Sequence, residues 1–425
     1  MASEGRAGSQ EDTRHTQVRD SASGGANTRS VALGLVPAPD IPEKIAYDLA
    51  DQLPELLKKH IDDRVDWEVR VVCDPLTGAE REAPDILDET HELMQQEGWD
   101  YAICLTDLPV LRGRQVVVAD ADETRGVGGI SLPPLGVTLL RRRTLEAMLQ
   151  LVSEVHQGTS DSDRDREGQR QQDTGAAQES DGEGRLRGGG ARQLIGHRLT
   201  ERLSPIKRVT PSDEDMDVDV RFIAPRASGR LRLLAGMVYA NGPLGLFTVM
   251  KSALAAAFAT GAFVLVTPSI WQLGYAGGLV RMFALMVVSL VAMVVWFIIS
   301  HGLWERPSEA GSRYLAGLYN AATALTLSVA VLFSYVVLYV LILLAALVFI
   351  EAGYFQSSIQ SVVGRPIGLG DYLILAWMTA SLAVVAGAIG SGLEDDETVL
   401  RATYGYRQRR RSEESEEESQ QKEEE

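Results

Sequence analysis

The chain has 425 residues, a length that fits two or three domains. Asp and Glu outnumber Lys and Arg by 58 to 41, so the net charge is −17, and we expect no nucleic acid among its partners. The two cysteines, Cys73 and Cys104, are too few for a disulfide-rich domain and do not have the spacing of a zinc site. Both lie in apolar, strand-like runs, so we expect buried free thiols.

The N-terminal half predicts a cytosolic domain behind a polar leader. Residues 1–30 contain no apolar run, so they lack the core of a signal peptide, and we expect them to be disordered and cytosolic. From 31 to 157 strand-length apolar runs alternate with helical periodicity, which predicts an α/β domain of two or three layers. We expect strands near 30–36, 67–72, 101–105, 115–119 and 129–132, and helices near 40–56 (bent at Pro54), 86–97 and 137–156.

Acidic side chains follow two of these strands. Asp107 follows the third, and Asp120 and Asp122 follow the fourth. Ligands of open α/β sheets bind at the carboxyl ends of strands, so we take these three carboxylates as candidate ligand-binding residues, for a divalent cation or a polar ligand. Ordinary loop and turn carboxylates are the alternative. His91 begins a zinc-like motif, but Gln95 replaces its second histidine, so we predict no catalytic residue, cofactor or metal ligand.

A polar linker and a juxtamembrane segment follow the domain. Residues 158–190 lack periodicity and are mostly Ser, Asp, Arg, Glu, Gln and Gly, as in flexible linkers. Within the juxtamembrane segment 191–251, residues 216–223 alternate like a strand, either at an edge of the soluble sheet or leading into the membrane. The apolar stretch 231–249 is interrupted by glycine and proline, and we expect part of it to lie as a helix on the cytosolic leaflet.

Four long uncharged stretches between 252 and 393 predict a transmembrane domain of four helices. We place the spans at about 252–271 and 282–300, within 314–350, and at about 371–393. The third stretch is much longer than a bilayer core requires. We prefer one long helix there, tilted or projecting beyond the bilayer, to two separate spans.

Basic residues flank this domain at both ends. They are Arg230, Arg232 and Lys251 before it, and Arg409, Arg410 and Arg411 after it. By the positive-inside rule both termini lie in the cytosol, which requires an even number of spans in a multi-pass protein of the plasma membrane. The segment 394–425 ends in a run of Glu, Ser and Gln that we expect to be disordered, as a solubilising tail or a lure for a basic partner.

No Asp, Glu, Lys, Arg or His falls inside the predicted spans, and charges such as Asp371 stop at their borders, which argues against an ion-coupled transporter or a proton relay. They do contain small residues at every fourth position, which allow helix backbones to approach closely in lipid. One stripe comprises Ala253, Ala257 and Gly261, and another comprises Thr379, Ala383, Gly387 and Ser391. Packing within one bundle and contact with a second copy of the chain are the two interpretations.

Three segments carry a resemblance to known proteins: 100–109 (DYAICLTDLP), 207–211 (KRVTP) and 231–237 (LRLLAGM). With them, the pairing of an α/β half with four C-terminal spans resembles a group of uncharacterised bacterial integral-membrane proteins. That group implies this architecture and no activity. The order of strands and helices in 31–157 is also similar to the front half of archaemetzincin-like zincins, although the matching helix has only His156 and no zinc motif.

These observations favour a non-enzymatic membrane protein. We expect a cytosolic α/β module, tethered to a four-helix membrane domain, that acts in binding, sensing or scaffolding. The alternatives are a metal-dependent enzyme that uses the three strand-end carboxylates and a transporter of an uncharged or lipid-like solute. The lipid bilayer is the expected partner, together with a protein partner or a homo-oligomer.

Overall fold

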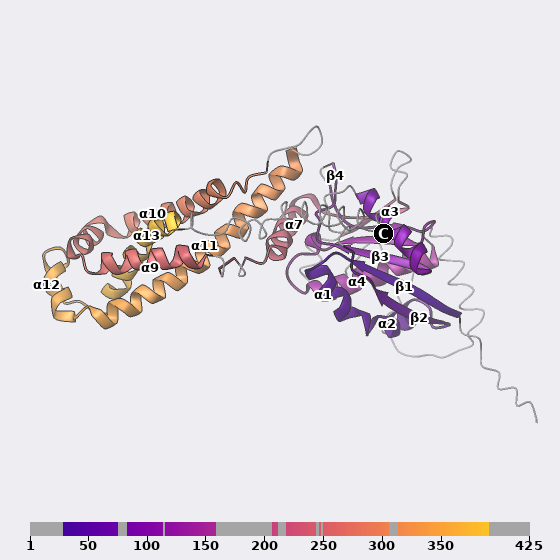
Figure 1. Cartoon of the computed structure of the whole chain (residues 1–425), viewed down its shortest axis with the longest axis horizontal. Helices are drawn as coiled ribbons and strands as arrows, with labels where there is room; N and C mark the ends of the chain where they lie inside the picture. The colour runs from indigo at the N-terminus through magenta and orange to yellow at the C-terminus, as the bar shows by residue number, and fades with distance from the viewer. Residues whose placement is uncertain are drawn as a thin grey trace, which may run out of the picture.

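A computed structural model describes residues 29–74, 83–113, 115–158, 206–210, 218–243, 246–247, 250–305 and 313–390. Nearly all of the N-terminal segment, the linker and the whole acidic tail that we expected to be disordered lie outside these residues, as do Ser391 and the basic cluster at 409–411. The described chain forms an α/β body at one end and a helical bundle at the other (Figure 1).

The α/β body is built on one mixed sheet in the strand order β2-β1-β3-β6-β5-β8-β7, with the short β4 paired to β5. Strands β2, β1, β3 and β6 are parallel, whereas β5 and β8 run antiparallel to their neighbours. The strands are β1 (Arg29–Pro37), β2 (Val65–Val71), β3 (Tyr101–Thr106), β4 (Leu111–Arg112), β5 (Gln115–Asp122), β6 (Val127–Ser131), β7 (Lys207–Val209) and β8 (Val220–Ala224).

Helices cover both faces of this sheet, which gives three layers. Helices α1 (Ile41–Ala50), α2 (Leu53–His60) and α4 (Leu140–Gln157) share the larger apolar core with the strands, and α3 (Ala83–Glu97) covers a smaller core on the other face. The predicted bent helix is in fact two helices, because Pro54 occupies the first turn of α2, where its missing N–H removes no helical hydrogen bond. The alternating stretch 216–223 supplies β8, so the sheet continues beyond the predicted domain end.

Three helices in the described chain are long and apolar enough to cross a membrane, which indicates a membrane protein. They are α10 (Pro268–Ser300), α11 (Arg313–Phe349) and α13 (Leu369–Gly390). The stretch predicted as the first span forms α9 (Lys251–Leu265), an apolar helix of only 15 residues. It is shorter than predicted because Pro268 begins the next helix, and α10 is itself broken at Gly278, where φ is 73°.

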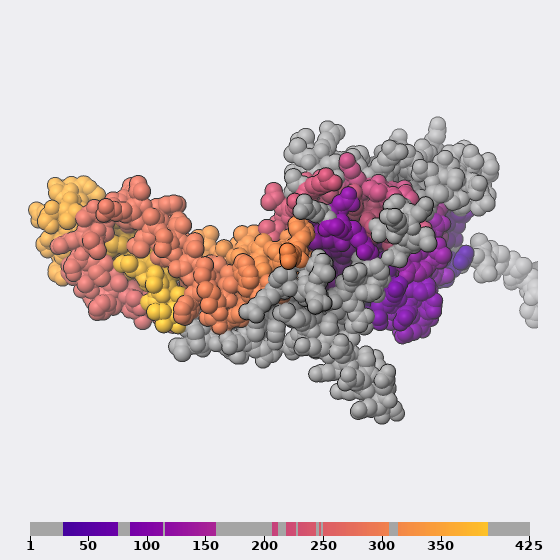
Figure 2. Space-filling view, turned by 90° about the horizontal axis from the view of Figure 1, so that it is seen from above, coloured from indigo at the N-terminus to yellow at the C-terminus, as the bar shows by residue number. Residues whose placement is uncertain are grey.

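The long uncharged stretch forms a single helix, as preferred from the sequence. Helix α11 has 37 residues and belongs to both parts of the molecule (Figures 1 and 2). Near its N-terminus Tyr319 is 3% exposed and Ala322 is fully buried, and both belong to the core of the α/β body. Its later turns, with Leu338 and Ile342, belong to the core of the bundle. The helix is long because it serves two cores.

Helix α7 (Arg226–Ala240) joins the α/β body to α11 (Figure 1). The guanidinium of Arg230 lies 5.5 Å from the ring centre of Tyr314, and Asn241 at the other end of α7 donates a hydrogen bond of 3.1 Å to Thr326. Residues 230 and 314 are separated along the chain by nearly the same number of residues as 241 and 326, so α7 and α11 run parallel. The helix expected on the leaflet therefore packs against protein along this length.

Helix α12 (Ala352–Val363) lies at the end of the bundle that is far from the sheet (Figure 1). Its Phe355 is fully buried and packs edge-on against the rings of Trp271 and Tyr372. Beside it, the buried carboxylate of Asp371 accepts two hydrogen bonds from the guanidinium of Arg365. These contacts fix α10, α12 and α13 to one another at this end.

Candidate functional site

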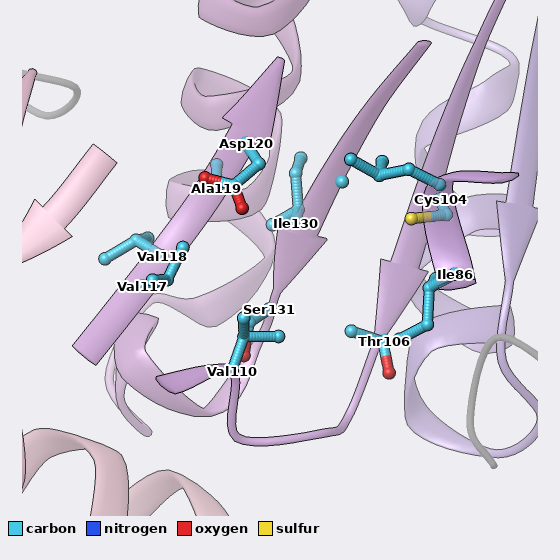
Figure 3. Close-up of a pocket in the computed structure, with 12 residues that line it drawn as sticks. Ile86, Cys104, Thr106, Val110, Val117, Val118, Ala119, Asp120, Ile130 and Ser131 are labelled. Carbon is cyan, nitrogen blue, oxygen red and sulfur yellow. The ribbon is translucent and has the colours of Figure 1, made fainter. Parts of the chain in front are cut away.

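A pocket opens on the α3 face of the sheet, between α3 and strands β3, β5 and β6 (Figure 3). Most of its wall is apolar, and four polar side chains reach it: Cys104, Thr106, Asp120 and Ser131. Its cavity volume is about 20 Å³, which is room for one water molecule. In this conformation the pocket therefore does not hold a larger ligand.

The space exists because β6 has a glycine at its centre. A Cβ added to Gly129 would lie 3.1 Å from Cys104 Sγ and 3.3 Å from Leu87 Cδ2. The hydroxyls at the lower end already have partners, since Thr106 accepts a hydrogen bond of 3.0 Å from the backbone N–H of Leu108 and Ser131 donates to the carbonyl of the same residue. These two polar groups shape the β3–β4 connection.

Cys104 is not arranged as a nucleophile. Burial raises the pKa of the Cys104 thiol to about 11, so the group stays protonated at neutral pH. Cys73 likewise forms no disulfide, but it is half-buried and not fully buried as we expected. The polar residues of the pocket therefore include no activated thiol.

Asp120 forms a buried ion pair across the sheet. Its Oδ1 lies 3.0 Å from Nε of Arg221, and each side chain is 6% exposed. The two residues stand directly opposite each other on the antiparallel strands β5 and β8. A buried carboxylate in this position is neutralised by the guanidinium, so its first role is to fix β8 in the sheet.

The structure does not bring the three predicted carboxylates together. Asp122 lies opposite Val127 at the start of β6, whereas Asp107 follows Thr106, which pairs with the last residue of β6. The two therefore lie at opposite ends of the sheet, and Asp120 alone lines the pocket. Asp122 instead accepts hydrogen bonds from the backbone N–H and Nε of Arg125. Among the described residues no group of His, Cys, Asp and Glu is placed to hold a metal ion.

A second polar cluster was not anticipated from the sequence. His156 at the end of α4 has its Nε2 3.5 Å from Asp62 and its Nδ1 3.3 Å from the hydroxyl of Tyr101. Burial opposes ionisation of Asp62, but hydrogen bonds from Arg64 outweigh it and hold the pKa of that carboxyl below its usual value. No local motif signals this cluster, because its members come from three separate segments. It ties α4 to the edge of the sheet.

The small-residue stripes of α9 and α13 face each other in the bundle. A Cβ added to Gly387 would lie 2.9 Å from the carbonyl O of Ala253 and 3.0 Å from the Cβ of Ala257. A Cβ added to Gly261 would lie 3.6 Å from the Cβ of Ala383. The two backbones thus approach closely within one chain.

The predicted basic interface residues differ in their burial and in their contacts. Arg230 stacks on Tyr314, Arg232 is half-buried beside Gly136, and Lys251 is exposed at the start of α9. Of the three predicted basic residues that the structure describes, Lys251 alone presents an exposed side chain.

A small cavity of about 10 Å³ lies between α9, α10, α11 and α13. Ser334 and Tyr335 are its polar lining residues. This volume is at the lower limit for a single water molecule. It therefore does not support passage of a solute in this conformation.

Comparison with models of known protein families, with curated proteins and with solved structures finds no match. The architecture alone agrees with the expectation from the sequence: an α/β sheet domain followed by helices long and apolar enough to cross a membrane. The function has to be argued from the contacts between these two parts.

Proposed function

We propose that this protein is a membrane-tethered sensing module, in which a cytosolic α/β domain responds to the state of a four-helix membrane domain. The observation that supports the proposal is the dual membership of α11. Tyr319 and Ala322 belong to the core of the α/β body, while the same helix contributes most of its length to the bundle. A change in the tilt of α11 thus acts directly on the packing of the α/β body.

The fourth span in this proposal is α9. Its 15 residues reach about 22 Å, less than the roughly 30 Å of a bilayer core. It nevertheless packs along α13 as a full member of the bundle. Four passes leave both ends of the bundle chain on the side of the α/β body, and the basic residues that flank the spans favour the cytosol of the plasma membrane for that side.

A continuous chain of contacts leads from the sheet to α11. Strand β6 forms one wall of the α3-face pocket and leads directly into the short helix η2 (Pro133–Leu135). Helix α7 packs on η2, and α7 in turn lies along α11. The carbonyl of Leu135 also accepts a hydrogen bond of 2.5 Å from Arg143 of α4.

The contact between η2 and α7 is the tightest step of this chain. A Cβ added to Gly236 would lie 2.2 Å from the carbonyl O of Pro133 and 2.7 Å from its Cα. Both neighbouring atoms belong to the backbone, so they cannot give way by changing a rotamer. The two segments therefore move together, and Gly236 is the residue that allows it.

This proposal accounts for the site better than catalysis or transport. The pocket beside Asp120 accommodates a single water molecule, and the carboxylate itself is held by Arg221. The cavity inside the bundle is smaller still. In contrast to these small cavities, α11 takes part in the cores of both the α/β body and the bundle.

The test changes the membrane and measures the α/β body. Full-length protein is placed in nanodiscs of short-chain and long-chain lipids, because a helix of fixed length changes its tilt with bilayer thickness. Hydrogen exchange is then followed at residues 127–135, which cover β6 and η2. We expect exchange there to differ between the two bilayers in the wild-type protein.

A matched pair of glycine variants identifies the route. Gly236→Val breaks the close approach to Pro133, so the difference between bilayers should disappear in this variant. Gly317→Ala lies on α11 with nothing within 4 Å of the added Cβ, so it should keep the difference. Exchange at 127–135 that is the same in both bilayers for the wild-type protein would contradict the proposal.

A further inference from the structure

An open apolar groove lies at the end of α10 that is nearest the α/β body. Its volume is about 540 Å³, far larger than the cavities inside the sheet domain and the bundle. It is lined by Val295, Ile298, Ile299, Gly302 and Trp304. Among the described residues no charged side chain contributes to this lining, and Ile299 and Trp304 are 72% and 57% exposed.

The groove is continuous with the lipid-facing side of α10. Exposed apolar side chains recur along this helix at spacings of three and four residues, which places them on one face. They are Val280, Phe283, Val287, Val291, Val295 and Ile299. The groove begins where this face ends, and Trp304 follows at the position where an exposed aromatic marks the boundary between hydrocarbon and headgroups.

We propose that this groove binds an acyl chain of a phospholipid in the leaflet next to the α/β body. The described lining residues are aliphatic, glycine or tryptophan, which suits an acyl chain, and the volume falls within the range of small-molecule sites. The position at the end of the lipid-facing stripe gives a chain direct access from the bilayer. Trp304 stands where the chain joins its headgroup.

The segment that carries Trp304 is hydrogen-bonded to α11. The residue after Trp304 is Glu305, whose backbone N–H donates 2.8 Å to Oδ1 of Asn320 and whose carbonyl accepts 3.0 Å from Nδ2 of the same side chain. Asn320 adjoins Tyr319, which is buried in the core of the α/β body. An acyl chain in the groove therefore touches a segment that is tied to the sensing helix. Only this readout rests on the proposed function; binding of the lipid does not.

The experiment compares the groove with the rest of the same stripe. Full-length protein in phosphatidylcholine nanodiscs is labelled with a phospholipid that carries a diazirine on its acyl chain, and labelled peptides are identified by mass spectrometry. We expect labelling at 295–304 to exceed labelling at 280–291 several-fold. Val295→Trp fills the groove and should reduce the excess to the level of the stripe. Val288→Trp, at a position that is 64% exposed against 46% for Val295 but lies outside the groove, should leave it unchanged.

Two results overturn the inference. Uniform labelling along α10 would show ordinary boundary lipid only. Cross-linking of Trp304 to a second copy of the chain, in place of lipid, would show that the groove is a contact between copies. Either result leaves the thickness test of the proposed function standing, because that test reads β6 and η2 and uses no labelled lipid.

Discussion

The buried ion pair between Asp120 and Arg221 provides a quantitative test of how the sheet is held together. Replacing Asp120 by Leu leaves a guanidinium that is 6% exposed without the carboxylate that neutralises it. Breaking one partner of such a pair costs about 3–5 kcal/mol. For a domain of this size each kcal/mol lowers the melting temperature by about 2–4 °C, so we expect a loss of roughly 10 °C.

The double variant supplies the control. Asp120→Leu combined with Arg221→Met removes both charges and keeps the volume, and such replacements are often neutral or stabilising. Thermal unfolding of the full-length protein in detergent, followed by the fluorescence of its six tryptophans, which include Trp67 and Trp99 in the α/β body, measures both variants. If the single and double variants lose the same stability, the reasoning is refuted, because the cost would then come from packing and not from an uncompensated charge.

The same residue separates the structural role from the enzyme alternative. Because Arg221 holds the carboxylate of Asp120, calorimetric titration of the protein with divalent ions should show no binding. Ion binding that disappears in Asp120→Asn would instead support a metal-dependent enzyme.

Three further predictions follow from the buried groups. The Arg64 hydrogen bonds lower the pKa of Asp62, so this carboxylate stabilises the fold above its unfolded pKa of about 3.9. The contribution is lost as the pH falls through the lower folded pKa. Asp62→Asn should therefore make stability less dependent on pH in the acid range. Cys104, with its raised pKa, should react with iodoacetamide only after unfolding, whereas half-buried Cys73 should react in the folded protein. Gly387→Val should force α9 and α13 apart and cost about 1–3 kcal/mol, measurable as a lower melting temperature of the bundle.

The positions of strands were predictable, but their directions were not. Alternating apolar residues marked β2 and the 216–223 strand, because a half-buried strand must place every second side chain in a core. Nothing in that pattern says which neighbour a strand pairs with. Asp107 and Asp122 both lie near strand ends, as expected. However, β5 runs antiparallel to β3, so Asp122 lies at the opposite end of the strands from Asp107.

The membrane helices show the same division between local and long-range information. Apolar length predicted the single helix α11, since no glycine or proline interrupts it between Ala321 and Phe349. The break at Gly278 was missed because hydropathy does not register backbone conformation. The close contact at Gly236 could not be predicted from the sequence either. It depends on Pro133, about a hundred residues earlier, and is evident only from the distance between the two backbones.

A helix that belongs to two cores cannot adjust to one of them alone. If α11 were joined to the α/β body by a flexible loop, a change of tilt in the bilayer would be absorbed by that loop. Instead Tyr319 and Ala322 are as deeply buried as the core residues of the sheet, and Asn320 between them is hydrogen-bonded to the segment that leaves α10. Packed interiors transmit displacement because they have little free volume in which to absorb it. The length of α11 is thus the physical reason to expect the α/β body to follow the helical bundle.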